Sequence, residues 1–298
     1  MNRVTIVTPT YNRGYIIHRL IASVLQQTDD NFKWLVIDDG SSDNTEAIFS
    51  DFQKGHPAFS FMYVKTENGG KQQAINLAVT MVDTEYVFIV DSDDHLVPDA
   101  IGKINQWIND KEIDEQYAGV SGVKGFDPQT PVSGKEIHFA SGYVDATNLE
   151  RGKYGLSADM AEVYKTDILR KYPFEVFPGE KFVPEATVWD RIAKDGYKLR
   201  WHEDIIYICE YLPDGLTGQS WKLMRDNPMG YAKLFNTQLM TRDNKSWKTC
   251  LQMVTQLILG HHWAYIFRSN NPGKALVCTP AAFLLSLRRR RQYKENIG

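Results

Sequence analysis

The feature that most constrains this chain is a buried strand that ends abruptly in acid. Residues 86–90 read Tyr-Val-Phe-Ile-Val, and the next four positions hold three carboxylates, Asp91, Asp93 and Asp94. A continuous apolar run of this kind is typical of a strand buried on both faces of a parallel sheet. Ligands of such sheets bind at the carboxyl ends of the strands, so clustered carboxylates there indicate a divalent cation or a polyhydroxyl group. The alternative is a solvated turn in which Asp93 or Asp94 caps the next helix.

The first 110 residues repeat a rhythm of strand and helix that predicts parallel βαβ units. Short apolar runs are each followed by a segment in which apolar residues recur with helical spacing. Besides the strand at 86–90, we expect strands at residues 4–8, 34–37 and 59–64. Strands and helices that alternate through short loops form right-handed crossover units, so the loops after these strands should all emerge at one edge of the sheet.

Beyond residue 110 the rhythm changes twice. Residues 111–212 mix strands and helices, and the region 213–298 is wholly helical by periodicity. The expected strands are 117–123, 137–144, 160–164 and 199–211, and the expected helices are 184–194, 221–240, 247–268 and 275–290. We therefore predict a first domain at 1–212, divided into halves at 1–110 and 111–212, followed by a helical region at 213–298.

Composition narrows the class to a globular intracellular protein. Of the 298 residues, 43% are hydrophobic and the formal net charge is −3, which argues against nucleic acid as the main partner. The three scattered cysteines form neither a disulfide framework nor a metal-ligand pair, as is typical of a reducing compartment. The sequence starts without the apolar core of a signal peptide and has no apolar run long enough to span a bilayer, so we expect a cytoplasmic protein.

Three polar loops should meet at the carboxyl edge of the predicted sheet. They are residues 9–13, 38–42 and 91–94. Asp93 can bind Mg²⁺ or Mn²⁺, whereas Asp91 and Asp39 can accept hydrogen bonds from a ribose or a base. Tyr11 offers a planar face for stacking. Neither a Gly-x-Gly-x-x-Gly loop nor a Walker lysine loop follows the first strand, which disfavours dinucleotide oxidoreductases and P-loop enzymes.

These loops closely resemble the signature loops of glycosyltransferase family 2, enzymes of the GT-A fold. The matching segments are Thr8-Pro9-Thr10-Tyr11-Asn12-Arg13, Val36-Ile37-Asp38-Asp39-Gly40-Ser41-Ser42-Asp43, Asp91-Ser92-Asp93-Asp94 and, in support, Asn68-Gly69-Gly70-Lys71. The resemblance covers at least residues 4–110. It implies that 1–212 is the catalytic domain, with a nucleotide-sugar-binding half at 1–110 and an acceptor-side half at 111–212. It implies an α/β fold of the GT-A type, Rossmann-like, with a mostly parallel sheet flanked by helices and here a C-terminal helical extension. It also implies inverting transfer of a sugar from a nucleotide diphosphate sugar, for which we expect UDP, to an acceptor hydroxyl.

The resemblance assigns roles to matching positions. Asp39 resembles the residue that reads the base, Asp91 resembles the ribose ligand, and Asp93 resembles the ligand of a catalytic Mn²⁺ or Mg²⁺, which would offset charge on the departing diphosphate. The other expected nucleotide contacts are Pro9, Thr10, Tyr11, Arg13, Lys71 and Ser92. For Lys71 the alternative is a solvated helix residue.

Inversion by direct displacement also needs a general base on the acceptor side. In similar enzymes this carboxylate lies at the start of a helix in the second half, and Phe182-Val183-Pro184-Glu185 resembles that element, so we assign Glu185. Family members often carry Asp here after another acid, and this departure leaves the alternative that Glu185 only favours the first helical turn. His202 is expected as a further metal ligand, since some related enzymes recruit a late histidine; the alternative is a hydrogen-bonded strand residue.

Residues 275–291 form an apolar segment that ends in four arginines. Two alternatives are open: a helix on an anionic cytoplasmic leaflet at the inner face of the cell membrane, or a core helix with a solvated basic end.

We expect a hexosyl- or N-acetylhexosaminyltransferase that acts on a saccharide or lipid-linked saccharide acceptor in bacterial-type surface polysaccharide or glycolipid assembly. The rivals are a non-catalytic nucleotide-sugar-binding protein of the same fold and a sugar-nucleotide pyrophosphorylase, although the latter would need a glycine-rich loop after the first strand.

Overall fold

A nine-stranded mixed sheet forms the first of two structural units, which comprises residues 1–173 and 195–210. The second unit comprises residues 174–194 and 211–298 and is helical. Within them, the computed structural model describes residues 3–55, 57–210, 212, 215, 218, 220–242 and 246–297. The predicted division at residue 212 therefore differs at one point, since residues 174–194 pack with the helical unit. The residues on either side of residue 212, namely 211 and 213, lie outside the described part, and Tyr211 was the end of a predicted strand.

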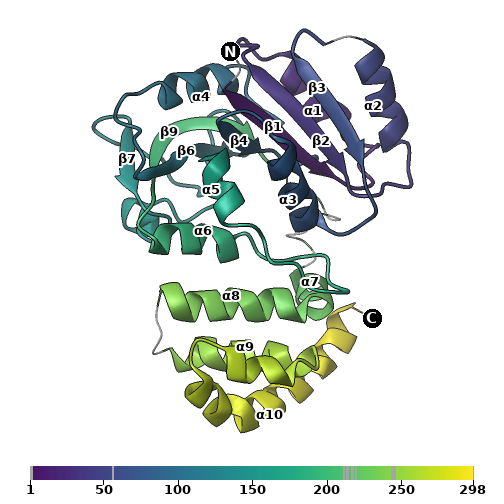
Figure 1. Cartoon of the computed structure of the whole chain (residues 1–298), viewed down its shortest axis with the longest axis vertical. Helices are drawn as coiled ribbons and strands as arrows, with labels where there is room; N and C mark the ends of the chain where they lie inside the picture. Colours follow the sequence, from purple (N-terminus) through teal and green to yellow (C-terminus); the bar gives the residue numbers. More distant parts are fainter. Residues whose placement is uncertain are drawn as a thin grey trace. The chain divides into compact units, whose positions relative to one another are not determined.

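Four parallel strands make one half of the sheet, as the sequence predicts. They are β1 (Val4–Thr10), β2 (Phe32–Asp38), β3 (Ser60–Lys65) and β4 (Tyr86–Ile89), in the spatial order β3-β2-β1-β4 (Figure 1). In the register of β1 and β2, Thr10 pairs with Asp38, so the two strands end side by side. The loops that follow the strands therefore share one edge, which confirms the parallel α/β class.

The helices of this half bury the strands from both sides. They are α1 (His18–Leu25), α2 (Thr45–Lys54), α3 (Lys71–Met81) and α4 (Ala100–Ile108). Leu20 of α1, Phe49 of α2 and Ile104 of α4 join one buried cluster around Trp34 of β2. Helix α3 packs against β1 and β2 through residues outside that cluster. Because successive strand side chains point to opposite faces, α3 covers the other face of the sheet and its first residue lies at the loop edge.

The remaining strands extend the sheet with mixed direction. They are β5 (His95–Leu96), β6 (Tyr117–Gly125), β7 (Tyr143–Ala146), β8 (Met160–Lys165) and β9 (Lys198–Ile208), accompanied by η1 (Arg151–Tyr154) and α5 (Thr166–Lys171). The predicted strand at 137–144 was wrong over most of its length, since only Tyr143 onward pairs with β9. Gly142, with a φ of 74°, turns the chain immediately before it. Strand β5 was not predicted because two residues carry no periodic pattern.

The second unit consists of helices around their own core. They are α6 (Ala186–Lys194), α7 (Ser220–Asp226), α8 (Pro228–Thr241), α9 (Trp247–Leu259), η2 (Trp263–Arg268) and α10 (Pro272–Ile297). The single helix predicted at 221–240 is two, because Pro228 has no backbone N–H to continue α7 and instead opens α8. The helix predicted at 247–268 ends near Gly260, and His261 has a φ of 60°. None of the helices in the described part is long and apolar enough to cross a membrane.

Candidate active site

The three predicted loops meet at the carboxyl edge of β1, β2 and β4. The backbone N–H of Asn12 donates to Ser41 Oγ at 2.8 Å, and the N–H of Ser42 donates to Asn12 Oδ1 at the same distance. Asn12 has a φ of 52°, a left-handed conformation that asparagine tolerates better than most residues. Arg13 then reaches the third loop, where its guanidinium lies 3.4 Å from an Asp93 oxygen. Residues from all three loops therefore lie in one site.

Asp39 joins the end of β2 to the start of α3. Its side chain is buried, and its two oxygens accept the backbone N–H groups of Gly69 at 2.7 Å and Gly70 at 2.8 Å. Gly40 beside it has a φ of 78°, and a Cβ there would lie 2.9 Å from the backbone nitrogen of Asn68. The residue predicted to read the base thus also fixes the loop that delivers Lys71.

Lys71 and Asp91 form an ion pair within the site. The Lys71 ammonium lies 2.6 Å from Asp91 Oδ1, and both side chains are largely buried. The pKa of Asp91 lies below its usual value: burial acts to raise it, but the positive charges of Lys71 and Lys124 outweigh burial. Asp91 is therefore an anion in the folded protein, and Lys71 is a half-buried partner of that anion, unlike the solvated helix residue that was the alternative.

Of the two carboxylates Asp91 and Asp93, Asp93 is the one whose negative charge is less offset by nearby positive charge. Burial and the negative charge of Asp91 raise its pKa above the usual value, although Arg13 opposes this shift. Its side chain remains 21% exposed, so a ligand can reach it. Binding of a cation would stabilise the ionised form of Asp93, because the positive charge would offset both the burial of this carboxylate and its repulsion by Asp91.

Asp94 helps to fix the acidic loop at residues 91–94 against β9. Tyr207 of β9 donates its hydroxyl hydrogen to Asp94 Oδ2 at 2.7 Å, and the same hydroxyl oxygen accepts the backbone N–H of Asp91 at 2.9 Å. Burial and the charge of Asp91 raise the pKa of Asp94 to about 7. Lys124 lies over the Tyr207 ring, 4.1 Å from its centroid. Sequence reasoning missed Tyr207, which lies 113 residues after Asp94 and belongs to no local motif.

The predicted nucleotide contacts at the end of β1 differ in accessibility. Pro9 and Thr10 are buried strand residues, whereas Tyr11 is 47% exposed. Ser92, between the two key acids, is buried. Tyr11 therefore carries the ring face that a flat ligand can stack on, and Pro9 and Thr10 shape the edge beneath it.

The arrangement fits a divalent cation that is coordinated partly by the protein and partly by the phosphates of a bound substrate. Within the residues that the structure describes, no group of three or more His, Cys, Asp or Glu side chains has the geometry to hold a metal ion. Mg²⁺ and similar cations often bind through one or two carboxylates plus substrate phosphates and water. Asp93, accessible beside Asp91, provides the donor that such a site requires.

The structure does not bring His202 to this site. Its ring is buried and stacks on Trp107, with ring centroids 4.1 Å apart and an angle of 4° between the planes. Tyr207 on the same strand reaches Asp94, and five residues of strand correspond to about 16 Å. Because a metal ligand must lie near 2 Å from its ion, we do not retain His202 in the proposed metal shell.

The buried His202 makes stability depend on pH. Burial lowers its pKa to about 4, whereas an unfolded histidine titrates near 6.5. Between these values the unfolded chain binds a proton that the folded protein does not, so stability should fall as pH drops through this window, by up to ~3 kcal/mol. Urea unfolding at pH 7.5 and pH 5 should show a smaller loss in His202→Phe than in wild type. The exposed His138→Gln variant should match wild type; equal losses in all three proteins would contradict the prediction.

Glu185, the predicted base, belongs to the helical unit. It directly precedes α6, and its carbonyl oxygen accepts the N–H groups of Val188 at 2.8 Å and Trp189 at 3.1 Å. The neighbouring acid Asp190 is fully buried in a two-point ion pair with Arg242, at 2.8 and 2.9 Å. That pairing makes Asp190 a structural residue and leaves Glu185 as the acid at the start of the helix.

The segment before Glu185 is firmly attached to α8. Glu180 accepts the backbone N–H groups of Met229 and Gly230, each at 2.8 Å, at the start of that helix. Asn227 Oδ1 accepts the N–H groups of Lys181 and Phe182 at 2.8 and 2.9 Å. A Cβ on Gly230 would lie 2.3 Å from the Phe182 carbonyl oxygen. This close approach fixes the backbone that carries Glu185, and local sequence reasoning missed it.

Comparison with known families gives a match over half of the chain. The family model described as Glycosyl transferase family 2 matches residues 5–156. Glycosyltransferase GlyG of Streptococcus pneumoniae is 31% identical over 111 residues, which are 37% of this chain and 36% of the relative. Poly(ribitol-phosphate) beta-N-acetylglucosaminyltransferase TarP of Staphylococcus aureus is 29% identical over 173 residues, covering 57% of this chain and 51% of TarP. The chain thus spans about a third to a half of the length of these two relatives.

A third relative is matched over most of its length. The GalNAc(5)-diNAcBac-PP-undecaprenol beta-1,3-glucosyltransferase of Campylobacter jejuni is 24% identical over 273 residues, covering 84% of this chain and 80% of the relative. Among solved structures, Staphylococcus aureus TarS 1-349 in complex with UDP-GlcNAc has a TM-score of 0.60 at 15% identity, covering 97% of this chain and 92% of TarS. The mannosyltransferase PcManGT from Pyrobaculum calidifontis, in complex with GDP-Man and Mn²⁺, has a TM-score of 0.59 at 20% identity, covering 98% and 83%. These structural likenesses confirm the predicted GT-A fold.

Proposed function

Because the chain belongs to glycosyltransferase family 2, we propose that it transfers a sugar from a UDP-sugar to an acceptor hydroxyl with inversion at the anomeric carbon. The observation that carries this proposal is the convergence of Arg13, Lys71, Asp91 and Asp93 on one sheet edge beside the exposed ring of Tyr11. The site offers a stacking face, a carboxylate for a cation and two basic side chains. A nucleotide diphosphate has a base, a ribose and an anionic diphosphate that these groups match in chemistry.

In this proposal, Asp93 binds Mn²⁺ or Mg²⁺ together with the donor diphosphate, and Asp91 accepts a hydrogen bond from the ribose. The bound cation supplies Lewis-acid stabilisation of the departing diphosphate. Arg13 and Lys71 add positive charge at the same place, since each already faces one of the two carboxylates. Each Asp39 oxygen accepts one backbone N–H, from Gly69 or from Gly70, and a carboxylate oxygen can accept more than one hydrogen bond, which is compatible with a contact to a base N–H.

The acceptor side of the proposal rests on Glu185. A carboxylate at this point can take the proton from the acceptor hydroxyl as that oxygen attacks the anomeric carbon. The names of two relatives point to cell-surface glycans: poly(ribitol-phosphate) for TarP and teichuronic acid biosynthesis for the glycosyltransferase TuaG of Bacillus subtilis. We therefore propose a hexosyl- or N-acetylhexosaminyltransferase that acts on a saccharide or lipid-linked saccharide acceptor in bacterial-type surface polysaccharide or glycolipid assembly.

Calorimetric titration of UDP, GDP and a panel of UDP-sugars, with Mn²⁺ and then with EDTA, tests the donor class. We expect UDP and one UDP-sugar to bind in the presence of Mn²⁺ and to bind far more weakly in EDTA. Preferential binding of GDP would replace the donor class that we propose. Donor hydrolysis or transfer, measured as UDP release, separates an enzyme from a protein that only binds nucleotide sugars.

We also propose that the outer face of α10 contacts an anionic membrane. Its outward apolar residues are 44–68% exposed; they are Leu276, Val277, Phe283, Leu284 and Leu287. They run directly into Arg288, Arg290 and Arg291, which are exposed, whereas Arg289 turns inward to Gln252 and Met224. An exposed apolar helix face with a basic end is typical of helices that lie in the membrane interface. Such attachment would hold the enzyme on the surface that carries a lipid-linked acceptor.

Replacing Arg288, Arg290 and Arg291 together by Ala should weaken binding to anionic vesicles by about 100-fold, because each basic residue near such a surface contributes about 1 kcal/mol. Sedimentation with phosphatidylglycerol vesicles and with phosphatidylcholine vesicles measures the difference. The matched control removes the same charge from the first unit by replacing Lys54, Lys111 and Lys153 together by Ala. Truncating α10 is a poor test because Ala275, Cys278 and Ala282 belong to the helical core. Equal partitioning of the two triple variants would contradict the membrane proposal.

A further inference from the structure

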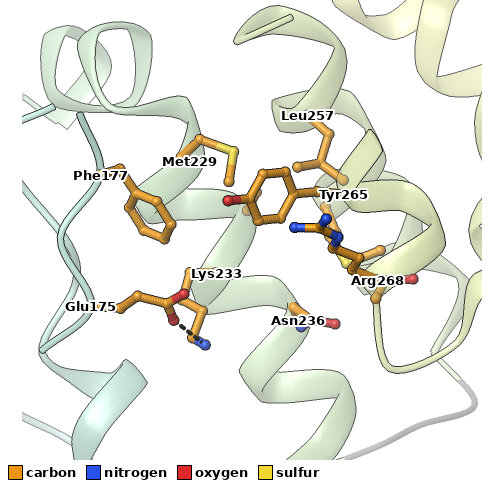
Figure 2. Close-up of a pocket in the computed structure, with 11 residues that line it drawn as sticks. Glu175, Phe177, Met229, Lys233, Asn236, Leu257, Tyr265 and Arg268 are labelled. Carbon is orange, nitrogen blue, oxygen red and sulfur yellow. Dashed lines mark ion pairs between the residues drawn. The ribbon is translucent and has the colours of Figure 1, made fainter. Parts of the chain in front are cut away.

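A cavity of about 220 Å³ opens within the helical unit, formed by residues that the proposed transfer reaction does not use (Figure 2). Four segments line it: residues 175–177 ahead of α6, one face of α8, the middle of α9, and η2 with the residue after it. The lining side chains include Glu175, Phe177, Met229, Lys233, Tyr265 and Arg268. Because all of these residues belong to one structural unit, the cavity is a feature of that unit alone.

One side of the cavity is apolar. Phe177, Met229, Met253 and Leu257 line it and are members of the buried core cluster of the helical unit. In Figure 2, the Phe177 ring and the Met229 side chain face Tyr265 across the cavity. This wall offers an aromatic ring and a thioether as a surface for the C–H face of a ring.

The other side of the cavity has one uncompensated positive charge. Lys233 forms an ion pair with Glu175, so these two charges offset one another. Arg268 stacks on Tyr265, with its guanidinium carbon 5.7 Å from the ring centroid, and pairs with no carboxylate in the described part of the chain. Arg268 is exposed and its guanidinium points into the cavity (Figure 2).

The remaining hydrogen-bonding capacity of the cavity consists largely of donors. Asn236 uses its side-chain oxygen to accept the Asn270 N–H at 2.9 Å, which leaves its amide hydrogens to serve a ligand. The Tyr265 hydroxyl can donate as well, and a guanidinium only donates. A cavity rich in donors and carrying a positive charge favours a ligand rich in acceptors and carrying a negative charge.

We infer that this cavity binds one anionic sugar unit of the acceptor glycan, with the carboxylate or phosphate of that unit on Arg268 and its ring against Phe177 and Met229. The guanidinium fork matches the two oxygens of a carboxylate or phosphate. A cavity of about 220 Å³ can accommodate a single sugar ring with its substituent. This inference rests on the proposed function only in naming the ligand as part of the acceptor.

Titration of the full-length protein with three small probes tests the inference. The probes are methyl glucuronide, glucose 6-phosphate and neutral methyl glucoside. Binding is measured by ligand-observed NMR in the absence of any sugar donor. We expect at least one of the two anionic probes to bind about tenfold or more tightly than the neutral one, since a charge-assisted hydrogen bond contributes roughly 1.5–3 kcal/mol. The tighter of the two anionic probes identifies whether a carboxylate or a phosphate occupies the site.

Variants place the binding in the cavity. Arg268→Ala should weaken binding of the preferred anionic probe by about 10- to 100-fold, and Arg268→Lys should give an intermediate loss because it keeps the charge without the fork. Arg225→Ala, which removes an exposed arginine of α7 that does not line the cavity, should bind like wild type. Equal affinity for the neutral and anionic probes, no anionic binding at millimolar concentration, or wild-type affinity in Arg268→Ala would each overturn the inference. These titrations contain no sugar donor, so they do not depend on the donor site. Failure of UDP-sugar binding in the separate calorimetric titration would count against the proposed function and not against this inference.

Discussion

Asp93→Ala should lower the rate of sugar transfer by a factor on the order of 1,000 or more, since a divalent cation contributes several kcal/mol to the stabilisation of a leaving diphosphate. Asp93 is the less compensated of two neighbouring carboxylates, and its pKa is raised by burial and by the charge of Asp91. Removing it relieves the repulsion in the folded protein, so the fold should be retained while the preferred donor group for a cation is lost. Calorimetry of UDP with Mn²⁺ and with EDTA should show that binding no longer depends on the metal.

A matched substitution separates this effect from a change of surface charge. Asp51→Ala removes an aspartate whose side chain is 78% exposed on α2 and should leave turnover and metal-dependent binding unchanged. Arg13 faces Asp93 and contributes positive charge near the diphosphate in this variant as well, so weak UDP binding without metal is compatible with the proposal. Transfer in Asp93→Ala within tenfold of wild type would show that this carboxylate does not hold the catalytic cation.

The parallel half of the fold and its loops could be predicted because their signals are local. The strand at 86–90 is apolar throughout, and the acids that end it mark the sheet edge within the same ten residues. Asp39 was placed correctly at that edge for the same reason. Its bonds to Gly69 and Gly70 were not predicted, because they depend on where α3 begins relative to β2.

The residues that sequence reasoning missed act over long distances in the chain. Tyr207 supports the acidic loop from another strand, and nothing near it in sequence points to Asp94. His202 was expected as a metal ligand because some related enzymes recruit a late histidine, and its stacking on Trp107 could not be predicted because Trp107 lies 95 residues earlier in the chain. The break at Pro228 was different, since a proline inside a predicted helix is a local signal that should have divided it.

Residues 174–194 also show why domain boundaries are hard to predict. Nothing in this segment marks it as part of the helical unit, yet Glu180 accepts the first N–H groups of α8 and Val183 lies in the helical core. Phe174 and Trp189 contact edge to face within the segment, with ring centroids 5.7 Å apart. The attachment follows from these particular contacts, so the unit that carries the predicted base is fixed by packing that only the three-dimensional structure reveals.

Glu185→Gln should reduce transfer by about 100- to 10,000-fold while leaving the affinity for UDP nearly unchanged. Glutamine has the shape of glutamate and keeps the hydrogen-bonding position ahead of α6, but it cannot take a proton from the acceptor hydroxyl. Glu185→Asp, which keeps a carboxylate on a shorter side chain, should recover part of the activity. Steady-state kinetics should show that the loss in Glu185→Gln lies in kcat and not in the KM for the donor.

A second acid of the same segment provides the control for the base assignment. Glu180→Gln can still accept one of the two N–H groups at the start of α8 but not both through carboxylate oxygens, so it should cost about 1–3 kcal/mol of stability and keep a rate of transfer close to that of wild type. If Glu185 only stabilised its helix, its Gln variant would behave in the same way, with a lower melting temperature and a turnover close to wild type. Loss of UDP binding in Glu185→Gln would also refute the assignment, because a base on the acceptor side does not hold the donor. The two variants together thus distinguish a residue that moves a proton from one that holds the backbone.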